Sequence, residues 1–395
     1  MSRHFGGDRD IDRDEHTPDN PGPGPDLESV RRAIAALRKG APVVATDRRG
    51  DAWVAFGAEY AAADVIALMR RWRSGPPLLA LTDRRATLLH IPPSGEDVIL
   101  ITITNDMTAD TVLSLADPTA DLGHPLRGPF ERDGTAISDG LRGIIRMCKS
   151  AHLLPAAIAA PLPAGISAAE WADARGLAVV SADQIGQFEA AQANDLRQVA
   201  DAHVPLAGAE DTRLVAFRPG AGEREHLAII IGQPPSDEPV LVRLHSQCFT
   251  GDLLASLRCD CGDQLRGAIN VIAQAGGGVV LYLDQEGRDI GLVNKLRAYH
   301  LQDDGFDTIE ANERLGFEAD ERLFLVAAKM LRRCGFDRIR LLTNNPQKVA
   351  QLQHFGIDVV ERAPHAFPTN NHNEAYLATK ARRSGHYLDV GPDDD

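Results

Sequence analysis

Three cysteines in a short polar stretch constrain this chain more than any other feature. Cys248, Cys259 and Cys261 follow the spacing C-x10-C-x-C, and the last two flank an aspartate inside the polar run 258–263. Such a run is poor material for a hydrophobic core, although free cysteines are often small buried core residues. Thiolates are natural ligands of Zn²⁺, and three protein ligands leave a fourth tetrahedral position open for water. The spacing therefore favours a catalytic zinc site, with buried core cysteines as the alternative.

Length, charge and cysteine count limit the classes of protein to which this chain can belong. A chain of 395 residues predicts two or three domains, and 44% hydrophobic residues suffice for their cores. The net charge of -14 argues against a general nucleic-acid-binding protein, which would carry a basic surface. Five cysteines, three of them clustered, do not form a disulfide framework and fit a reducing, cytoplasmic compartment. No run of about 18 apolar residues predicts a membrane span, and the N-terminus lacks the apolar core of a signal peptide.

Changes in composition divide the chain into two regions between polar ends. Residues 1–26 are rich in Asp, Arg, Gly and Pro and residues 390–395 are polar, so both ends are predicted to be disordered. Between them, 27–191 and 196–389 are predicted to form two domains of the α+β or α/β class. The predicted helices are 27–39, 64–72, 264–275, 292–302, 322–334 and 346–355, with a further short helix capped by Asp183. The predicted strands are 42–45, 78–81, 98–104, 153–160, 177–181, 214–217, 228–231, 240–245, 279–283, 338–342 and 357–360.

Two polar segments follow directly after predicted strands, where ligand sites in α/β folds usually lie. In the segment 284–291, Glu286 could accept hydrogen bonds from a base, and Arg288 could bind a phosphate. The segment 343–348 opens a helix whose free backbone N–H groups attract anions, and Lys348 adds a positive charge. A solvated turn and a plain strand-to-helix connection are the alternatives for these segments.

From about residue 196 to residue 388, these segments together resemble the GTP cyclohydrolase II family, which begins riboflavin biosynthesis. The matching strings are His-Ser-Gln-Cys, Thr-Gly-Asp and Leu-Arg-Cys-Asp-Cys-Gly (245–262), Gln-Glu-Gly-Arg-Asp-Ile-Gly-Leu (285–292), Asn-Lys-Leu-Arg-Ala-Tyr (294–299), Leu-Gln-Asp (301–303), Phe-Asp-Thr and Glu-Ala-Asn (306–312), Leu-Gly-Phe and Ala-Asp-Glu-Arg (315–322), and Leu-Leu-Thr-Asn-Asn-Pro-Gln-Lys (341–348). So many strings in the right order make the resemblance highly specific. It implies hydrolysis of GTP to a diaminopyrimidinone ribosyl phosphate, formate and pyrophosphate.

The resemblance also implies roles for individual residues. The three cysteines hold one Zn²⁺ per subunit, which activates water for attack on C8 of guanine. Tyr299 matches a tyrosine needed for that hydrolysis, Arg322 an arginine that acts at the α-phosphate, and Asp320 a candidate proton acceptor. The positions that match GTP contacts are Val242, Arg243, Leu244, His245, Ser246, Gln247, Gln264, Glu286, Gly287, Arg288, Thr308, Thr343 and Lys348. The family further implies Mg²⁺ on the triphosphate and a homodimer.

One position departs from the resembled family. Members commonly have a basic residue directly before Gln-Glu-Gly-Arg, where this chain has Asp284. An acid near a triphosphate weakens binding unless it faces away or helps to hold Mg²⁺. We therefore expect Asp284 to affect substrate affinity rather than the chemistry, because every matched catalytic position is filled.

The first region, 27–191, resembles the 3,4-dihydroxy-2-butanone 4-phosphate synthase of bifunctional riboflavin enzymes. Segments in similar order include Leu-Thr-Asp-Arg-Arg-Ala (81–86) and Gly-His-Pro-Leu-Arg (123–127). The synthase's acidic metal-binding loop falls on 46–51, where its glutamates are missing, and its Gly-His-Thr-Glu segment falls near 138–141, which has neither His nor Glu. The resemblance therefore implies a degenerate, inactive domain that serves dimerisation, stability or regulation. A bifunctional enzyme and a catalytically silent GTP-binding regulator are the alternatives.

Overall fold

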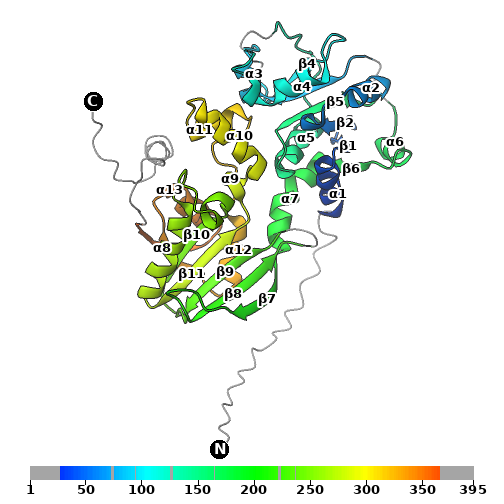
Figure 1. Cartoon of the computed structure of the whole chain (residues 1–395). Coiled ribbons are helices and arrows are strands. Elements are labelled where there is room, and N and C mark those ends of the chain that lie inside the picture. The colour runs from blue at the N-terminus through cyan, green and yellow to red at the C-terminus, as the bar shows by residue number, and fades with distance from the viewer. Residues whose placement is uncertain are drawn as a thin grey trace, which may run out of the picture.

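The computed structural model describes residues 27–364, except for 73–74, 94, 125–127, 164, 221–223 and 236. The ends predicted to be disordered, and part of the segment 123–127, lie outside the described residues. Figure 1 shows two β-sheets, one above the other in the view, with helices packed on both. We call residues 27–196, which contain the first sheet, the N-terminal half, and residues 197–364 the C-terminal half.

Six strands form the first sheet, in the order β4-β3-β5-β2-β1-β6. They are β1 (Val43–Thr46), β2 (Ala52–Gly57), β3 (Leu78–Thr82), β4 (Val98–Thr102), β5 (Ala156–Pro161) and β6 (Ala178–Ser181). Helices cover both faces, so most strand residues are buried, which explains the nearly continuous runs of Val, Ile, Leu and Ala. One face packs against α1 (Leu27–Arg38), α5 (Asp139–Ser150) and α7 (Ala182–Asn194), and the other against α2 (Ala63–Trp72), α3 (Asp83–Leu88), α4 (Ala109–Ala116) and α6 (Ala168–Asp173).

Seven strands form the second sheet, in the order β13-β12-β10-β11-β9-β8-β7. They are β7 (Arg197–His203), β8 (Thr212–Arg218), β9 (His226–Gly232), β10 (Val240–Ser246), β11 (Gly277–Leu283), β12 (Arg338–Leu342) and β13 (Asp358–Ala363). Helices α12 (Leu325–Arg333) and α13 (Pro346–His354) cover one face, and α8 (Cys261–Gln274) covers the other. Because β10 runs parallel to β11 and β12, the carboxyl ends of these strands meet at one edge, where the polar segments begin.

The helices α9 (Glu286–Asp289), α10 (Leu292–Asp303) and α11 (Thr308–Arg314) leave the second sheet and pack against the N-terminal half (Figure 1). Ala298, Leu301 and Phe317 share one hydrophobic cluster with Leu79 and Val112 of the first sheet and its helices. The two halves are therefore joined by a common core as well as by the chain. None of the described helices has both the length and the apolar character needed to cross a membrane.

The predicted strands and helices are present with shifted ends, but one helix begins later than predicted. Arg322 lies in a loop, and α12 begins only at Leu325. The carboxylate of Asp320 accepts hydrogen bonds from the backbone N–H and from the guanidinium of Arg322, which offers this segment an alternative to helical bonding. The sequence-based prediction also lacks β2, β7 and the helices α3, α4, α5, α6, α9 and α11. The short helix predicted to be capped by Asp183 is α7, but Ser181 caps it instead.

Candidate functional site

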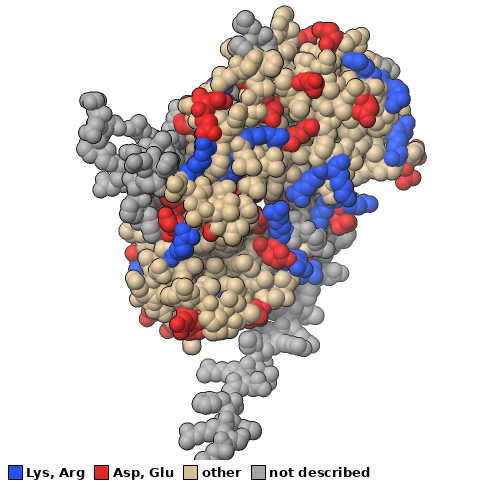
Figure 2. All heavy atoms as spheres, in the orientation of Figure 1, with Lys and Arg blue, Asp and Glu red and all other residues tan. Residues whose placement is uncertain are grey.

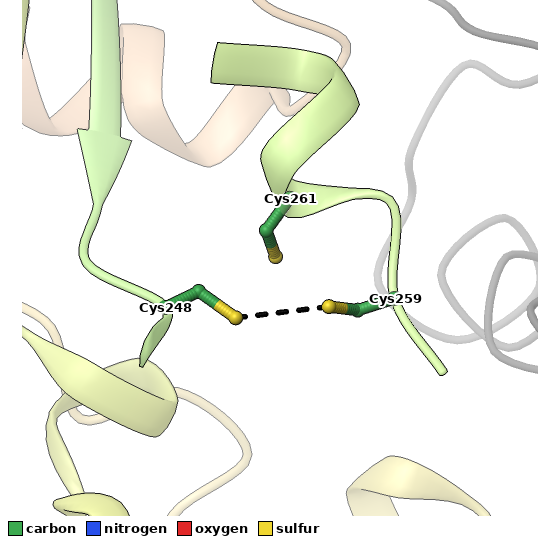
Figure 3. A group of neighbouring side chains, drawn as sticks. All are labelled: Cys248, Cys259 and Cys261. Carbon is green, nitrogen blue, oxygen red and sulfur yellow. Dashed lines mark hydrogen bonds between the residues drawn. The ribbon is translucent and has the colours of Figure 1, made fainter. Parts of the chain in front are cut away.

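Three cysteine sulfurs lie together near the carboxyl end of β10 (Figure 3). Cys248 follows β10, whereas Cys259 and Cys261 stand at the start of α8. All three Sγ atoms lie within 4.8 Å of one another, and those of Cys248 and Cys259 are 3.7 Å apart. A tetrahedral zinc with Zn–S distances of about 2.3 Å separates its sulfurs by about 3.8 Å. The cluster therefore has the dimensions of a three-thiolate zinc site, and no other such cluster of ligands occurs among the described residues.

Asp252 fixes the π-helical turn Phe249–Leu253, which follows Cys248. Its carboxylate accepts hydrogen bonds from the backbone N–H of Cys248 at 2.9 Å and from the hydroxyl of Tyr282 at 3.0 Å. One carboxylate oxygen also lies 3.0 Å from Nε2 of His245. The sequence analysis does not single out Asp252, although the matching string Thr-Gly-Asp contains it.

Gly251 lies against the cysteines. A Cβ atom at this position would lie 2.7 Å from Sγ of Cys259, 2.9 Å from Cβ of Cys261 and 3.1 Å from Sγ of Cys248. Those separations are shorter than van der Waals contact, so this position accepts only a residue without a Cβ atom unless the cysteines move.

Gly251→Ala is expected to lower zinc affinity about 10- to 100-fold, because the added methyl group would push the sulfurs apart. Competition with a coloured chelator measures the affinity. Gly134→Ala is the matched control, since a Cβ at that position has no neighbour within 4 Å and should leave zinc affinity unchanged. Equal zinc affinity in the two variants would show that Gly251 does not control the spacing of the sulfurs.

The three thiols differ in acidity. Hydrogen bonds from Cys259 and Cys261, together with the nearby ammonium of Lys295, lower the pKa of Cys248. The pKa of Cys261 is raised well above its ordinary value, because its thiol is hydrogen-bonded to Cys248 and Cys259 and is buried. Cys248 is therefore the thiol of the cluster that most readily becomes a thiolate, which is the form of cysteine that binds metal ions.

Lys295, on α10, reaches into the cysteine cluster. Its Nζ donates hydrogen bonds to Sγ of Cys248 and Oγ1 of Thr250, both at 3.0 Å, and to Oε1 of Glu286 at 2.7 Å. Burial alone would lower the pKa of Lys295, but the hydrogen bonds to Cys248 and Glu286 raise it, so the ammonium stays charged. Glu286 also accepts a hydrogen bond from the backbone N–H of Phe249 at 2.6 Å. The Lys295–Glu286 pair thus connects α10 to the turn that follows Cys248.

Glu286→Gln is expected to lower the free energy of unfolding by about 3 kcal/mol, because it leaves the ammonium of Lys295 buried without its carboxylate. The two side chains are only 6% and 10% exposed. Urea denaturation of the zinc-loaded protein measures the change. Glu361→Gln is the matched control, because its ion pair with Arg340 is exposed and should contribute less than about 1 kcal/mol. An equal loss in the free energy of unfolding in both variants would contradict the expected stabilisation by the buried Lys295–Glu286 pair.

A cavity of about 150 Å³ opens beside the cysteines. The predicted site residues that line it are Arg243, Leu244, His245, Ser246, Gln247, Cys248, Cys259, Cys261, Gln264, Gly287, Arg288, Tyr299, Thr308, Arg322, Thr343 and Lys348. Val242 lies instead in the hydrophobic core. Glu286 and Asp320 do not line the cavity but accept hydrogen bonds from the lining residues Lys295 and Arg322. Further lining residues, which the sequence analysis does not name as site residues, are Arg258, Ile290, Lys295, Ala298, Gln302, Asn312, Asn344 and Asn345.

Six basic side chains line this cavity, those of Arg243, Arg258, Arg288, Lys295, Arg322 and Lys348. Arg243 and Arg288 each donate a hydrogen bond of 2.9 Å to a backbone carbonyl, and Lys348 donates one of 3.0 Å. Arg322 donates to Oγ of Ser246 at 3.2 Å. Burial lowers the pKa of Arg243 to about 10, so it remains charged at neutral pH. The cavity of this acidic chain is therefore locally basic and suits an anionic ligand.

Tyr299 and Asp320 have well-defined protonation states. The hydroxyl of Tyr299 lies 3.4 Å from Oγ1 of Thr250, and burial raises the pKa of Tyr299 to about 12, so the phenol keeps its proton. Burial disfavours the charge on Asp320, but Arg322 and Arg288 lower its pKa below the usual value. Both carboxylate oxygens of Asp320 accept hydrogen bonds from Arg322, at 2.7 and 2.5 Å. This contact orients Arg322, and the role of Asp320 as a proton acceptor stays a prediction.

The segment α9 after β11 is a turn rather than a regular helix, because its backbone is left-handed at three successive residues. The φ angles are 65° at Gly287, 63° at Arg288 and 74° at Asp289. Glycine adopts this conformation readily, whereas the two residues with a Cβ are strained in it. The turn directs Arg288 toward the carbonyl of Ala319 and into the lining of the cavity.

Asp284 does not line this cavity. Its carboxylate lies 3.4 Å from Nη1 of Arg224, and its backbone N–H donates to Nδ1 of His226. All three residues line a larger, open cavity between the two halves, to which none of the three cysteines contributes. The acid that departs from the resembled family therefore lies outside the basic cavity.

The sequence of the C-terminal half matches a known family. A family model described as GTP cyclohydrolase II matches residues 197–364. The GTP cyclohydrolase-2 of Azospirillum brasilense is 52% identical over 365 residues, which cover 91% of this chain and 94% of that protein. This chain belongs to the GTP cyclohydrolase II family. The resemblance predicted from the strings between 245 and 348 is thus confirmed.

Members of the GTP cyclohydrolase II family differ in length. The GTP cyclohydrolase-2 of Cronobacter sakazakii is 53% identical over 193 residues, which are 98% of that protein but only 49% of this chain. The solved structure of a two-domain 3,4-dihydroxy-2-butanone 4-phosphate synthase from A. baumannii was also compared with this chain. The aligned region covers 86% of this chain and 99% of that one, with 17% identity and a TM-score of 0.33. No structural equivalence is inferred at this score, and the synthase-like character of 27–191 stays a prediction.

Proposed function

We propose that this protein is a zinc-dependent GTP cyclohydrolase II, which hydrolyses GTP to a diaminopyrimidinone ribosyl phosphate, formate and pyrophosphate in riboflavin biosynthesis. One observation carries the proposal: three cysteines and six basic side chains line the same cavity. A thiolate metal site beside concentrated positive charge suits a substrate with a ring to be hydrolysed and a triphosphate to be held. The match to the Azospirillum brasilense relative, which extends over most of the chain, supports this reading.

The hydrolytic end of the site would consist of the cysteines and Tyr299. Cys248, Cys259 and Cys261 would hold one Zn²⁺ per chain, because their sulfurs have the spacing of a tetrahedral site. Bound zinc supplies Lewis-acid chemistry that makes water nucleophilic near neutral pH. Tyr299, whose phenol keeps its proton, can donate a hydrogen bond to the purine ring or to the departing formyl group.

The phosphate end of the site would consist of the basic residues. Arg322 is oriented by both oxygens of Asp320, so its guanidinium can bind the α-phosphate in a fixed direction as pyrophosphate leaves. Arg243 and Lys348 are both buried, where their charge is screened little by solvent. We propose that they bind the triphosphate together with Mg²⁺. The polar segment 343–348 adds the hydroxyl of Thr343 to this side of the cavity.

The N-terminal half is proposed to be an inactive synthase-like domain. Its loop 46–51 has no glutamate, and Oδ1 of Asp47 accepts hydrogen bonds from the backbone N–H groups of Arg49 and Asp51, which close the turn. Arg48 forms an ion pair with Asp183. The carboxylate of Asp47, one of the two acids of the loop, thus serves local structure, which supports the absence of a metal-binding loop. We further propose a homodimer, which rests on the resemblance, and a cytoplasmic location, which rests on the cysteine content. Neither nucleic acid nor a membrane is proposed as a partner.

The test is to incubate the zinc-loaded protein with GTP and Mg²⁺ and to quantify formate, pyrophosphate and the pyrimidine product together. Equal amounts of all three are expected. Pyrophosphate without formate would mean that the ring is not opened, and bound GTP without any product would favour the silent regulator. Ribulose 5-phosphate offered in a parallel reaction should not be consumed, whereas its consumption would favour the bifunctional enzyme.

A further inference from the structure

The N-terminal half contacts several segments of the C-terminal half, and among them are three that carry residues proposed to act on GTP. The segments are helix α10, the loop 318–324 before α12 and the turn 286–291 after β11. Figure 2 shows acidic and basic side chains next to one another along the hollow between the upper and lower parts of the molecule. Several of the ion pairs at this boundary connect a residue of the N-terminal half to one of the three segments.

Arg297 connects α10 to the N-terminal half. It lies between Lys295 and Tyr299 in the sequence, and its guanidinium donates to the two carboxylate oxygens of Glu59 at 3.2 and 3.1 Å and to Asp117 at 3.0 Å. All three side chains in this contact are between 16% and 19% exposed. Because bidentate, charge-assisted hydrogen bonds fix the direction of a guanidinium, two acids of the N-terminal half help to set the rotation of α10.

Lys149, near the end of α5, holds the loop 318–324. Its Nζ lies 2.6 Å from Oε1 of Glu321, and the same oxygen accepts a hydrogen bond from the backbone N–H of Glu318 at 2.7 Å. Glu321 directly precedes Arg322. Since this loop is neither helix nor strand, side-chain contacts of this kind determine where Arg322 lies.

His152 of the N-terminal half meets the strained turn 286–291. Its carbonyl accepts a hydrogen bond of 2.9 Å from Nδ2 of Asn294, and its Nε2 lies 3.9 Å from Oδ1 of Asp289. The backbone of Gly291 packs so closely that a Cβ at this position would lie 2.7 Å from Cβ of His152. The turn that carries Arg288 is therefore supported from the N-terminal half as well.

We infer that the N-terminal half positions the GTP site, with Glu59, Asp117 and Lys149 as positioning residues for α10 and the loop 318–324. The inference rests on the proposed function. Misplacing a reacting group by about 1 Å can reduce the rate about 100-fold without removing a contact to the substrate. Loss of this support should therefore lower kcat more than it raises KM. The half-length relative from Cronobacter sakazakii has no room for such a domain, so the role would be specific to longer members.

The experiment compares kcat and KM for formate release in the full-length, zinc-loaded protein and its variants. Lys149→Met and the double variant Glu59→Gln/Asp117→Asn are each expected to have a kcat about 10- to 100-fold lower, with KM within about threefold of wild type. Zinc content should remain one per chain. Arg142→Ala is the control: its ion pairs lie within the N-terminal half, so kcat should not change.

A charge reversal separates positioning from general destabilisation. Lys149→Glu alone should lower kcat, and adding Glu321→Lys should restore part of the loss, because the ion pair is re-formed although the acceptor for the backbone N–H of Glu318 is removed. Wild-type kcat in Lys149→Met and in the double variant, or a failed rescue, would overturn the inference and leave the proposed function intact. A wild-type protein that releases no formate from GTP would overturn the proposed function and this inference with it.

Discussion

Cys259→Ser and Cys261→Ser are each expected to lose bound zinc and to release formate from GTP at least about 1000-fold more slowly than the wild type, since Lewis-acid activation of water is lost. Each change removes one of three sulfurs that lie within 4.8 Å of one another. A serine hydroxyl does not replace a thiolate as a zinc ligand at neutral pH. The remaining two sulfurs would leave the metal with too few protein ligands.

Zinc content by elemental analysis and formate release, measured on the same samples, test this expectation. Cys334→Ser is the matched control: Cys334 packs against the hydrophobic cluster of the second sheet and does not line the cavity, so zinc and turnover should persist. A chelator should inactivate the wild type, and added zinc should restore it but not the two variants. Formate release by a metal-free variant would refute the zinc mechanism.

Arg322→Ala is expected to reduce pyrophosphate release at least about 100-fold, because the charge that stabilises the departing phosphate is removed. Zinc content should not change, since Arg322 does not contact the cysteines. The free energy of unfolding should fall by no more than about 2 kcal/mol, because the Arg322–Asp320 pair is partly exposed. An assay of pyrophosphate release measures the first effect, and urea denaturation measures the free energy of unfolding.

Two further variants make the Arg322 test specific. Arg322→Lys keeps the positive charge but lacks the planar guanidinium that donates from two nitrogens to the two oxygens of Asp320, so activity should recover only in part. Arg266→Ala removes an exposed arginine from α8 and should behave as the wild type. Normal pyrophosphate release by Arg322→Ala would remove the role proposed for this residue.

The cysteines and the polar segments after β11 and β12 could be predicted because their signals are local. Glycine and proline mark the ends of buried strands, and polar residues at the carboxyl ends of parallel strands converge whatever the details of packing. The Asn345 cap and Pro346 at the start of α13 follow from short-range hydrogen bonding and fixed backbone angles. The family strings then connected these segments to one chemistry.

Residues whose environment depends on distant parts of the chain could not be predicted in this way. Lys295 has the pattern of a surface lysine on a helix, and only packing of α10 against the turn after Cys248 buries it. Arg85, in a polar stretch, is only 1% exposed because it pairs with Asp121. Arg322 was expected at a helix start because acids are frequent there, whereas its contact with Asp320 holds it in a loop.

The left-handed turn at 287–289 has a consequence for the balance between stability and activity. Arg288 and Asp289 together store about 2 kcal/mol or more of conformational strain, which the surrounding fold must offset. Relaxing this turn would make the protein more robust but would redirect Arg288 away from the cavity. In this chain, a gain in stability at these residues would therefore come with a loss of the Arg288 placement on which the proposed turnover depends.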